Sequence, residues 1–435
     1  MKANKAIRLL FINILAVIVA RSQPQIGGFV EYDNITYFKN IDEQKINGRN
    51  QVILQVELSH RINANADIFG AVEFRNDQDD PARDRIYLDE VFLNLYVGNF
   101  DIRIGKQIYA WGRADGFNPT DNLTVWDFSD ILDTEDEKIG LISGWVNYYA
   151  GNWTLAAVLA PSFVPSVLPL PNSRWFPQLP ESVPNPLYPQ FGPPALKANY
   201  IFAPQVLPDQ GFESTQYALK LSGFASGWDY SLSWFDGFDD LPAIHTSTEI
   251  DSSLTTAEIT LENRYHRRQA IGVDFATTSR AFGVRGEAAY YITEDWKGTD
   301  PNIDDDPYFQ YALGVDYTFR DLFAGKDLFI LLQWLQEIQI PDRGTEYRIF
   351  DLNHIFRKSF FGKADLKLGE FSRLTFEGVW NIDTEDWWMQ PGFEWSITDG
   401  VHLLATVDLL DGPQDSFFGI FSDNNRFQFR LKYSF

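Results

Sequence analysis

The last nine residues of the chain alternate between apolar and polar side chains without a break. From Phe427 to Phe435, five apolar side chains fall on one face of an extended strand. The other face carries four polar side chains, Gln428, Arg430, Lys432 and Ser434. A strand with lipid on its outer side and a watery lumen on its inner side requires this alternation. The pattern therefore favours a strand of a membrane barrel over a soluble edge strand.

The end of this strand carries a second signal. Phe435 ends the chain two residues after Tyr433. This ending resembles the carboxy-terminal signal by which bacterial outer-membrane proteins are recognised for insertion. We therefore expect the barrel-assembly machinery to be a partner that acts through Phe435.

The amino terminus indicates export. Lys2, Lys5 and Arg8 precede an apolar run over residues 9–20, and Ala20-Arg21-Ser22 places small residues where a signal peptidase reads them. The run is shorter than the roughly 20 residues that a spanning helix needs. Residues 1–22 are therefore predicted to be a cleaved signal peptide, and residues 23–435 a single barrel domain.

Composition narrows the class of protein further. The chain has 435 residues, no cysteine and a formal net charge of −24. It must therefore be stable in an oxidising compartment without disulfides, which a closed barrel can achieve. So acidic a chain argues against nucleic acid as a partner, because phosphates would be repelled.

The strand pattern predicts an all-β fold, a closed antiparallel transmembrane barrel of eighteen strands. The predicted strands cover residues 27–38, 50–60, 65–75, 85–97, 100–109, 137–149, 152–161, 213–224, 227–236, 268–277, 281–292, 307–319, 327–338, 357–368, 372–381, 385–397, 400–409 and 425–435. Connections after even-numbered strands are short and those after odd-numbered strands are mostly long. Since outer-membrane barrels have short periplasmic turns, both termini are predicted to be periplasmic. Sixteen strands is an open alternative, because residues 255–278 can be assigned in more than one way.

The period of two also predicts which residues face the lumen. Arg285 and Glu287 alternate with apolar residues over 282–290, and His402, Thr406 and Asp408 do so over 401–409. Charged side chains inside imply water inside. Arg285, Glu287 and His402 are therefore predicted to line a pore, while Trp and Tyr near the strand ends suit the aromatic girdles of the membrane interfaces.

One segment combines several unusual features. Residues 103–107 read Arg-Ile-Gly-Lys-Gln, and Trp111-Gly112 and then Asn118-Pro119-Thr120-Asp121 follow. This combination, R-x-G-K-Q with W-G and N-P-x-D, resembles a poorly characterised porin-like family of bacterial outer-membrane barrels, in the style of alginate-export and carbohydrate-porin barrels. The resemblance covers about forty residues together with the barrel architecture, and it implies little about the substrate.

We predict that this segment folds into the lumen. Gly112 and Pro119 force the chain off the strand path, and Asn118 and Asp121 have turn chemistry. Opposed charges would form a constriction there, a device that orients polar solutes by their dipoles. The predicted constriction residues are Arg103, Gln107, Trp111, Arg113, Asp115, Asn118 and Asp121. A structured external turn, whose charges bond only one another, is the open alternative.

The connection over residues 161–212 is the second candidate for function. It holds 13 of the chain's 22 prolines, and a loop this long is uncommon without a role. Proline-rich backbone is extended and stiff. With Trp175, Phe176, Tyr188 and Phe191 as its aromatic surface, this external loop is predicted to be a lid over the pore; a loop that only shields the barrel is the alternative.

Acidic clusters and histidines do not indicate a metal centre or an enzyme. Asp77, Asp79 and Asp80 lie in one predicted loop, and residues 300–306 hold four more aspartates, but their spacing fits no EF-hand. The sequence has no G-x-S-x-G, no H-E-x-x-H and no Gly-rich phosphate loop. We expect a solvated acidic rim, no metal, no cofactor and no enzymatic activity.

Together these features predict an outer-membrane porin or channel for the passive diffusion of small solutes in a Gram-negative-type bacterium. Its partners would be outer-membrane lipid, lipopolysaccharide and a small-molecule solute. Two alternatives are open. One is a dedicated transporter for a saccharide, an apolar molecule or an exported polymer, and the other is a plugged barrel with a structural or adhesive role.

Overall fold

The structure is a computed structural model that describes residues 23–41, 45–133, 137–209, 211–293, 307–323, 325–339 and 352–435. The predicted signal peptide, residues 1–22, lies outside the described residues. The same holds for the four aspartates within residues 300–306.

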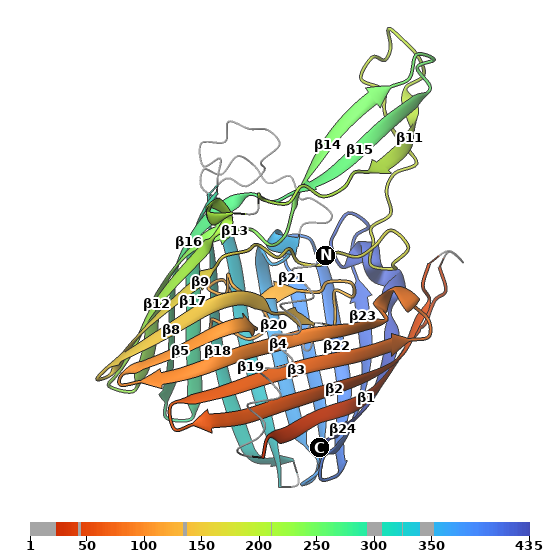
Figure 1. Ribbon diagram of the computed structural model, residues 1–435. Helices are drawn as coiled ribbons and strands as arrows, with labels where there is room; N and C mark the ends of the chain where they lie inside the picture. Colours follow the sequence, from red (N-terminus) through yellow and green to blue (C-terminus); the bar gives the residue numbers. More distant parts are fainter. Residues whose placement is uncertain are drawn as a thin grey trace.

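Within the described residues, eighteen strands form one closed antiparallel barrel (Figure 1). In order around the ring they are β1 (Gln25–Tyr37), β2 (Gly48–Asn63), β3 (Ala66–Asp77), β4 (Arg85–Val97), β5 (Phe100–Gln107), β8 (Leu141–Ala150), β9 (Trp153–Ala160), β12 (Gln216–Ala225), β13 (Trp228–Phe238), β16 (Arg267–Ser279), β17 (Phe282–Thr293), β18 (Tyr308–Phe323), β19 (Lys326–Gln339), β20 (Lys358–Lys367), β21 (Ser372–Asn381), β22 (Asp386–Thr398), β23 (Val401–Asp411) and β24 (Arg426–Ser434). The predicted eighteen-stranded barrel is confirmed, and the sixteen-stranded alternative is wrong.

The first and last strands close the ring. β24 pairs with β1 in a continuous antiparallel register from Phe29 opposite Ser434 to Tyr37 opposite Arg426. Short turns join the strands at the lower rim in Figure 1, where the carboxy terminus also lies. Between β12 and β13, for example, Ser226 and Gly227 have φ values of 53° and 82°, the left-handed conformation that two-residue hairpins require.

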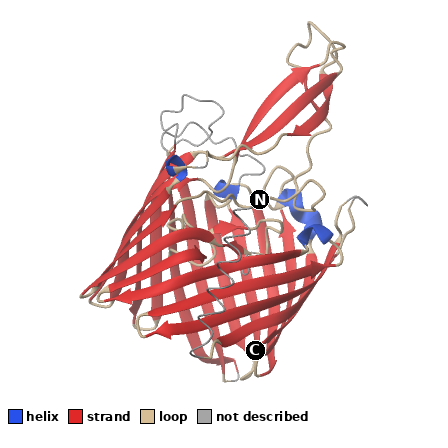
Figure 2. Cartoon of the chain, in the orientation of Figure 1, coloured by secondary structure: helices blue, strands red, loops and turns tan. Residues whose placement is uncertain are grey.

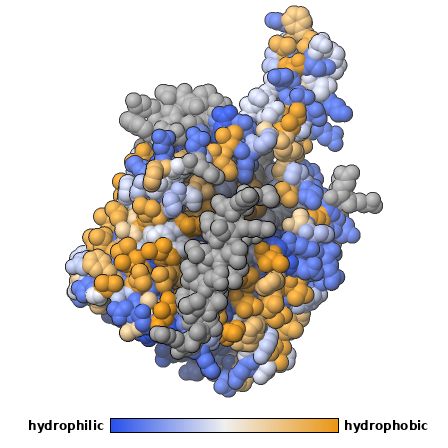
Figure 3. All heavy atoms as spheres, in the orientation of Figure 1, coloured by the Kyte–Doolittle hydropathy of each residue, from blue (hydrophilic) through white to orange (hydrophobic). Residues whose placement is uncertain are grey.

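Apolar side chains cover the outer face of the barrel. On β12, Tyr217, Leu219 and Leu221 remain 40–43% exposed, whereas Ala218 between them is buried on the inner face. Apolar surface spreads over the flank of the barrel in the space-filling view (Figure 3). This alternation is what a strand between lipid and a lumen needs.

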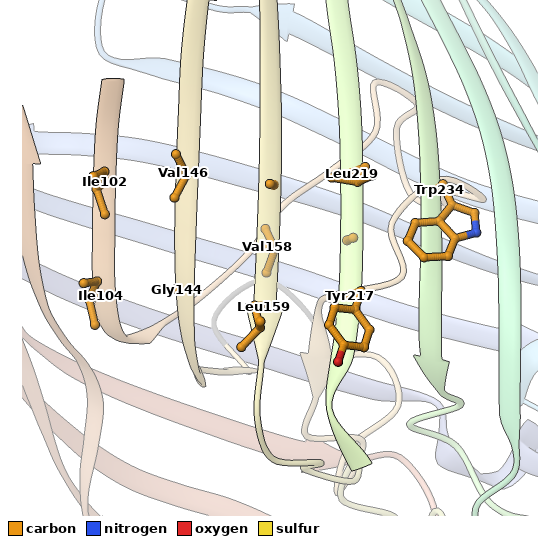
Figure 4. A pocket seen from close by; sticks show the side chains of 11 residues that line it. Ile102, Ile104, Gly144, Val146, Val158, Leu159, Tyr217, Leu219 and Trp234 are labelled. Atoms are coloured by element: carbon orange, nitrogen blue, oxygen red, sulfur yellow. The ribbon is translucent and has the colours of Figure 1, made fainter. Parts of the chain in front are cut away.

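A shallow hollow interrupts the outer face over β5, β8, β9, β12 and β13. Its volume is about 390 Å³, and all the residues that line it lie on these five strands (Figure 4). Gly144 and Ala157 leave room there between the larger side chains of Ile104, Leu159 and Trp234. The hollow is therefore a feature of the apolar outer surface and not of the lumen.

A second, four-stranded sheet projects beyond the upper rim (Figure 1). It consists of β10 (Ser182–Pro184), β11 (Ala195–Phe202), β14 (Ala243–Ile250) and β15 (Thr256–Arg264), and β11 and β15 pair in parallel. Leu196, Ala257 and Ile259 form its small core. The sequence patterns do not predict this sheet. Its strands β10 and β11 lie within residues 161–212, so part of the proline-rich connection is regular structure.

Helical structure in the described part of the chain is limited to four short 3-10 turns near the upper rim (Figure 2). These are η1 (Pro81–Arg83), η2 (Phe212–Ser214), η3 (Leu352–His354) and η4 (Gly419–Asn424). Among the described residues, no helix is long and apolar enough to cross a membrane.

Two apolar clusters lie inside the barrel, where connecting segments pack on inward-facing wall residues. In the first, Tyr109, Trp111, Leu123 and Val125 pack against wall residues that include Val158. In the second, Ile131 and Trp175 pack with Phe418 and Phe421 of the η4 region against wall residues including Leu331, Leu335 and Phe361. The lumen is therefore partly filled by the chain itself.

Candidate functional site

The chain leaves the barrel wall after β5 and turns into the lumen. We call residues 108–133 the inward segment. Gly112 and Gly116 have φ values of 110° and 79°, which L side chains rarely adopt. A Cβ atom on Gly112 would lie 2.9 Å from Oε2 of Glu287 and 3.0 Å from Cβ of Asn118. Glycine at this position therefore permits both the turn and the close approach to the wall.

The first half of the inward segment, residues 108–121, docks on the wall around β17. The Arg113 Nε lies 2.5 Å from Oδ1 of Asp274 on β16. Arg285 on β17 contacts Oδ2 of Asp115 at 2.7 Å. The backbone N–H and carbonyl of Asp115 both bond the side chain of Gln333 on β19, at 3.1 and 2.8 Å.

Glu287 on β17 forms the most buried of these contacts. Its Oε2 accepts a hydrogen bond from the Thr120 hydroxyl at 2.6 Å, and its Oε1 accepts one from the Ala114 N–H at 3.1 Å. The Glu287 side chain is almost fully buried, as part of a residue that is 3% exposed. Buried donors that lose such an acceptor are costly to leave unpaired, so Glu287 is a principal anchor of the first half.

The second half of the inward segment, residues 127–133, docks on a different part of the wall. Asp130 contacts Arg49 on β2 at 2.8 Å and Arg426 on β24 at 2.5 Å. Asp133 contacts Arg49 and, at 3.0 Å, Arg430 on β24. The side chains of Arg49, Asp130, Asp133 and Arg426 are nearly inaccessible to solvent, and that of Arg430 is mostly buried.

Two further carboxylates extend this contact along β3 and β4. Asp127 contacts Arg85 on β4 at 3.1 Å. Glu137, just before the short strand β7 (Lys138–Ile139), contacts Arg75 on β3 at 2.6 Å and Arg83 of η1 at 3.1 Å. We call Asp127, Asp130, Asp133 and Glu137 the loop carboxylates, and Arg49, Arg75, Arg83, Arg85, Arg426 and Arg430 the arginine wall.

The inward segment crosses the lumen. In the ring of eighteen strands, β17 stands nine positions from β2, which is the opposite side of the barrel. One half of the segment contacts β16, β17 and β19, and the other contacts β2, β4 and β24. A segment held by both walls narrows any path between the two rims.

Burial and charge act on the carboxylates of the segment in opposite directions. Burial raises the pKa of Asp121 to about 6, although the Thr124 hydroxyl and N–H bond its oxygens. Burial also tends to raise the pKa of Asp133, but Arg49 and Arg430 outweigh it and hold that pKa well below its usual range. The second half is therefore docked as a charged species.

The structure brings together two residues predicted to form the constriction, Arg113 and Asp115, and two predicted to line the pore, Arg285 and Glu287. Arg113 and Asp115 on the segment meet Asp274 and Arg285 of the wall, and Glu287 lies beside them. Trp111 and Asn118 belong to the same half of the segment: Trp111 is buried in the first apolar cluster, and Asn118 lies next to Gly112.

Other predicted residues lie apart from this group. Arg103 bonds Asn94 on the wall at 2.8 Å and stacks over Phe92, and Gln107 is buried against Ser143. Asp121 bonds Thr124 within the segment itself. His402 bonds Ser396 on β22, at 3.1 Å. Their predicted pore-lining roles stay predictions.

The aromatic residues predicted to form a lid divide between two places. Trp175 is buried inside the barrel with its ring 5.3 Å from that of Phe421. Phe176 packs 5.6 Å from Phe202 of β11. Tyr188 and Phe191 are 54% and 58% exposed, in the chain between β10 and β11. They do not form one continuous aromatic surface.

Sequence reasoning missed the loop carboxylates and the arginine wall. Two signals were present: the acidic run from Asp127 to Glu137, and arginines at alternate positions such as Arg83 and Arg85. Nothing in the sequence paired them, because the partners are far apart along the chain. Among the described residues, no group of three or more His, Asp or Glu side chains is arranged to hold a metal ion.

The fold and the segment across its lumen define a class, the porin-like barrel. The chain belongs to a family described as "Protein of unknown function (DUF1302)", whose model matches residues 32–297. No curated protein matches the chain.

Several solved barrels are similar in structure. A loop-deletion mutant of OmpT, an outer-membrane protein of Vibrio cholerae, is 12% identical with a TM-score of 0.44, over 95% of this chain and 99% of that one. OccK11 of Pseudomonas aeruginosa is 8% identical with a TM-score of 0.49, over 94% and 95%. A mutant of the Rh. blastica porin is 10% identical with a TM-score of 0.43, over 95% and 100%. At these values the likeness identifies no substrate.

Proposed function

We propose that this protein is an outer-membrane channel for the passive diffusion of small polar solutes, narrowed by the inward segment. The observation that supports this most is the segment's position across a lumen whose wall carries charged side chains on both sides. The apolar outer face suits lipid, so we also propose an outer-membrane location, with both termini periplasmic and residues 1–22 removed during export.

The proposed mechanism is restricted diffusion down a concentration gradient. Near the segment, Arg285 contacts Asp115 at 2.7 Å and Asp316 at 2.5 Å, and Arg113 contacts Asp274. Fixed charges of both signs at a constriction orient a passing dipole and slow ions of either sign. The inward segment therefore sets selectivity, and the gradient alone drives flux.

Reconstitution of the full-length protein into planar lipid bilayers tests this proposal. A passive channel gives stepwise conductance, and in liposomes it admits small sugars with rates that fall as solute size rises. A bilayer that stays silent at all voltages, with liposomes that do not swell, contradicts it. That result is the one expected for a plugged barrel with a structural or adhesive role.

A second candidate function is transport of an apolar molecule. The two apolar clusters inside the barrel support it, since Trp111, Trp175 and Phe421 are buried in the lumen where a purely aqueous pore has polar groups. Apolar sites of this kind bind apolar ligands. A liposome assay that shows uptake of a long-chain fatty acid but no swelling with sugars favours this candidate over the first.

A further inference from the structure

The arginine wall is an exception in a strongly acidic chain. The chain has a formal net charge of −24, yet the six arginines of this wall converge on one side of the lumen from β2, β3, η1, β4 and β24. Among the described residues, each of these arginines contacts at least one loop carboxylate, and each loop carboxylate contacts at least one of the arginines. The two sets match completely.

We infer that the arginine wall is a binding surface for solutes that carry two or more carboxylates, and that the loop carboxylates occupy it as built-in competitors. This inference rests on the proposed channel function, because it names the class of solute that the lumen would take. Guanidinium groups bind carboxylates with defined geometry and remain charged at any physiological pH.

The spacing of the contacts points to a solute with neighbouring carboxylates. Arg49 contacts both Asp130 and Asp133, so the two carboxylates share one guanidinium. Each of them also reaches a second arginine, since Asp130 contacts Arg426 and Asp133 contacts Arg430. Two adjacent carboxylate positions, each between two arginines, match a small di- or tricarboxylate such as citrate.

The wall without the loop carboxylates would be positive. Its own acids that contact the six arginines within the described residues are five, namely Glu31, Asp33, Glu73, Asp77 and Asp408. The four loop carboxylates reverse the local sign. Removing their charge therefore leaves a cationic surface that concentrates anions in the lumen.

Exchange of one carboxylate for another changes little in the ion pairs themselves. A solute carboxylate replaces a loop carboxylate on the same guanidinium, so no buried arginine is left unpaired, which would be the costly state. What opposes exchange is the apolar packing of the inward segment, in which Ile131 is 9% exposed and packs in the second cluster with Phe128. Citrate should therefore bind weakly to the native protein and more tightly when the loop carboxylates are neutral.

The test is isothermal titration of citrate into the full-length protein in detergent micelles at neutral pH. The variant D130N/D133N keeps the shape of both side chains and removes their charges. We expect its Kd for citrate to be lower than that of the native protein by about tenfold or more, the factor that one charged hydrogen bond supplies. Adding R49Q to this variant should abolish the gain.

D239N is the matched control, because Asp239 pairs with an arginine on the far side of the barrel, Arg268 of β16, at 2.6 Å. It should leave citrate binding unchanged. If D130N/D133N does not give a heat-modifiable barrel, D127N tests the same site at its more exposed edge, where the Arg85 side chain is 28% exposed. Equal citrate affinity in the native protein and the folded variants overturns the inference.

Bilayer recordings separate this inference from the proposed function. If the native protein conducts but D130N/D133N gains neither citrate affinity nor anion preference, the inference fails while the channel function stands. If no variant conducts but D130N/D133N binds citrate more tightly, the channel function fails and the arginine wall is still a carboxylate site.

Discussion

Glu287 offers the sharpest test of how the inward segment is held. The change E287A removes a buried acceptor from the Thr120 hydroxyl and the Ala114 N–H, which bond it at 2.6 and 3.1 Å. Each of these hydrogen bonds contributes about 0.5–1.5 kcal/mol, so the loss is about 1–3 kcal/mol in total. Since about 1.4 kcal/mol is a factor of ten, the equilibrium between the docked and released first half shifts toward release by roughly one to two orders of magnitude.

The partly exposed ion pair beside Glu287 compensates for little of this loss. The side chains of Arg285 and Asp115 are 27% and 37% exposed, and ion pairs of that kind contribute only about 0–1 kcal/mol. The backbone ladder of β17 is untouched, because Glu287 contributes a side chain and keeps its place between β16 and β18. The barrel should therefore stay folded while the segment loosens.

Single-channel recording and limited proteolysis measure the result. We expect E287A to raise the conductance and its noise, and to expose residues 112–121 to protease, with the heat-modifiable barrel retained. The matched control is E394A, whose carboxylate pairs with Arg373 at 2.5 Å on an exposed part of β22. If conductance and cleavage are the same in E287A and the native protein, Glu287 does not hold the segment and the reasoning is refuted.

Three further predictions concern other parts of the chain. Deleting Phe435 should reduce insertion and leave protein in the periplasm, and normal outer-membrane yield of a heat-modifiable barrel would contradict this. R113A/D121A should shift the reversal potential in a salt gradient, because Arg113 contacts Asp274 beside the constriction; unchanged selectivity would remove both residues from the selectivity site. The pKa of Asp121 is raised to about 6 from about 3.9 in the unfolded chain, so docking is most stable at low pH and weakens as the pH rises through 6. Protease should therefore cleave the segment more slowly at pH 5 than at pH 7, with correction for the protease's own pH dependence, and D121N should remove that difference.

The barrel was predictable from the sequence because each of its signals is local. Alternation over nine or more residues and short turns such as Gly98-Asn99 recur along the chain, and closure follows from pairing the terminal strands. The projecting sheet escaped prediction. Its strands are short, Pro184 lies in β10, and β11 pairs in parallel with β15, which begins far along the chain at Thr256.

The candidate site was predictable only in part, for a related reason. The glycines and the Asn-Pro turn predicted that residues 112–121 leave the wall, and the period of two placed Arg285 and Glu287 on the lumen side to meet them. The arginine wall could not be paired with its carboxylates in the same way. Asp130 and Arg426 are 296 residues apart, and only the closure of the barrel brings them together.

The two halves of the inward segment should respond independently. Between them, β6 (Val125–Trp126) pairs with β7, and the Val167 backbone bonds both Trp126 and Phe128, at 2.9 and 2.8 Å. Val125 is also buried in the first apolar cluster. This fixed middle separates release around Glu287 from release around Arg49, so effects of E287A and D130N/D133N on the free energy of opening should add to within about 0.5 kcal/mol. A combined variant whose change in the free energy of opening, measured from the fraction of time in the open conductance state, far exceeds the sum of the two single changes would show that the segment moves as one body.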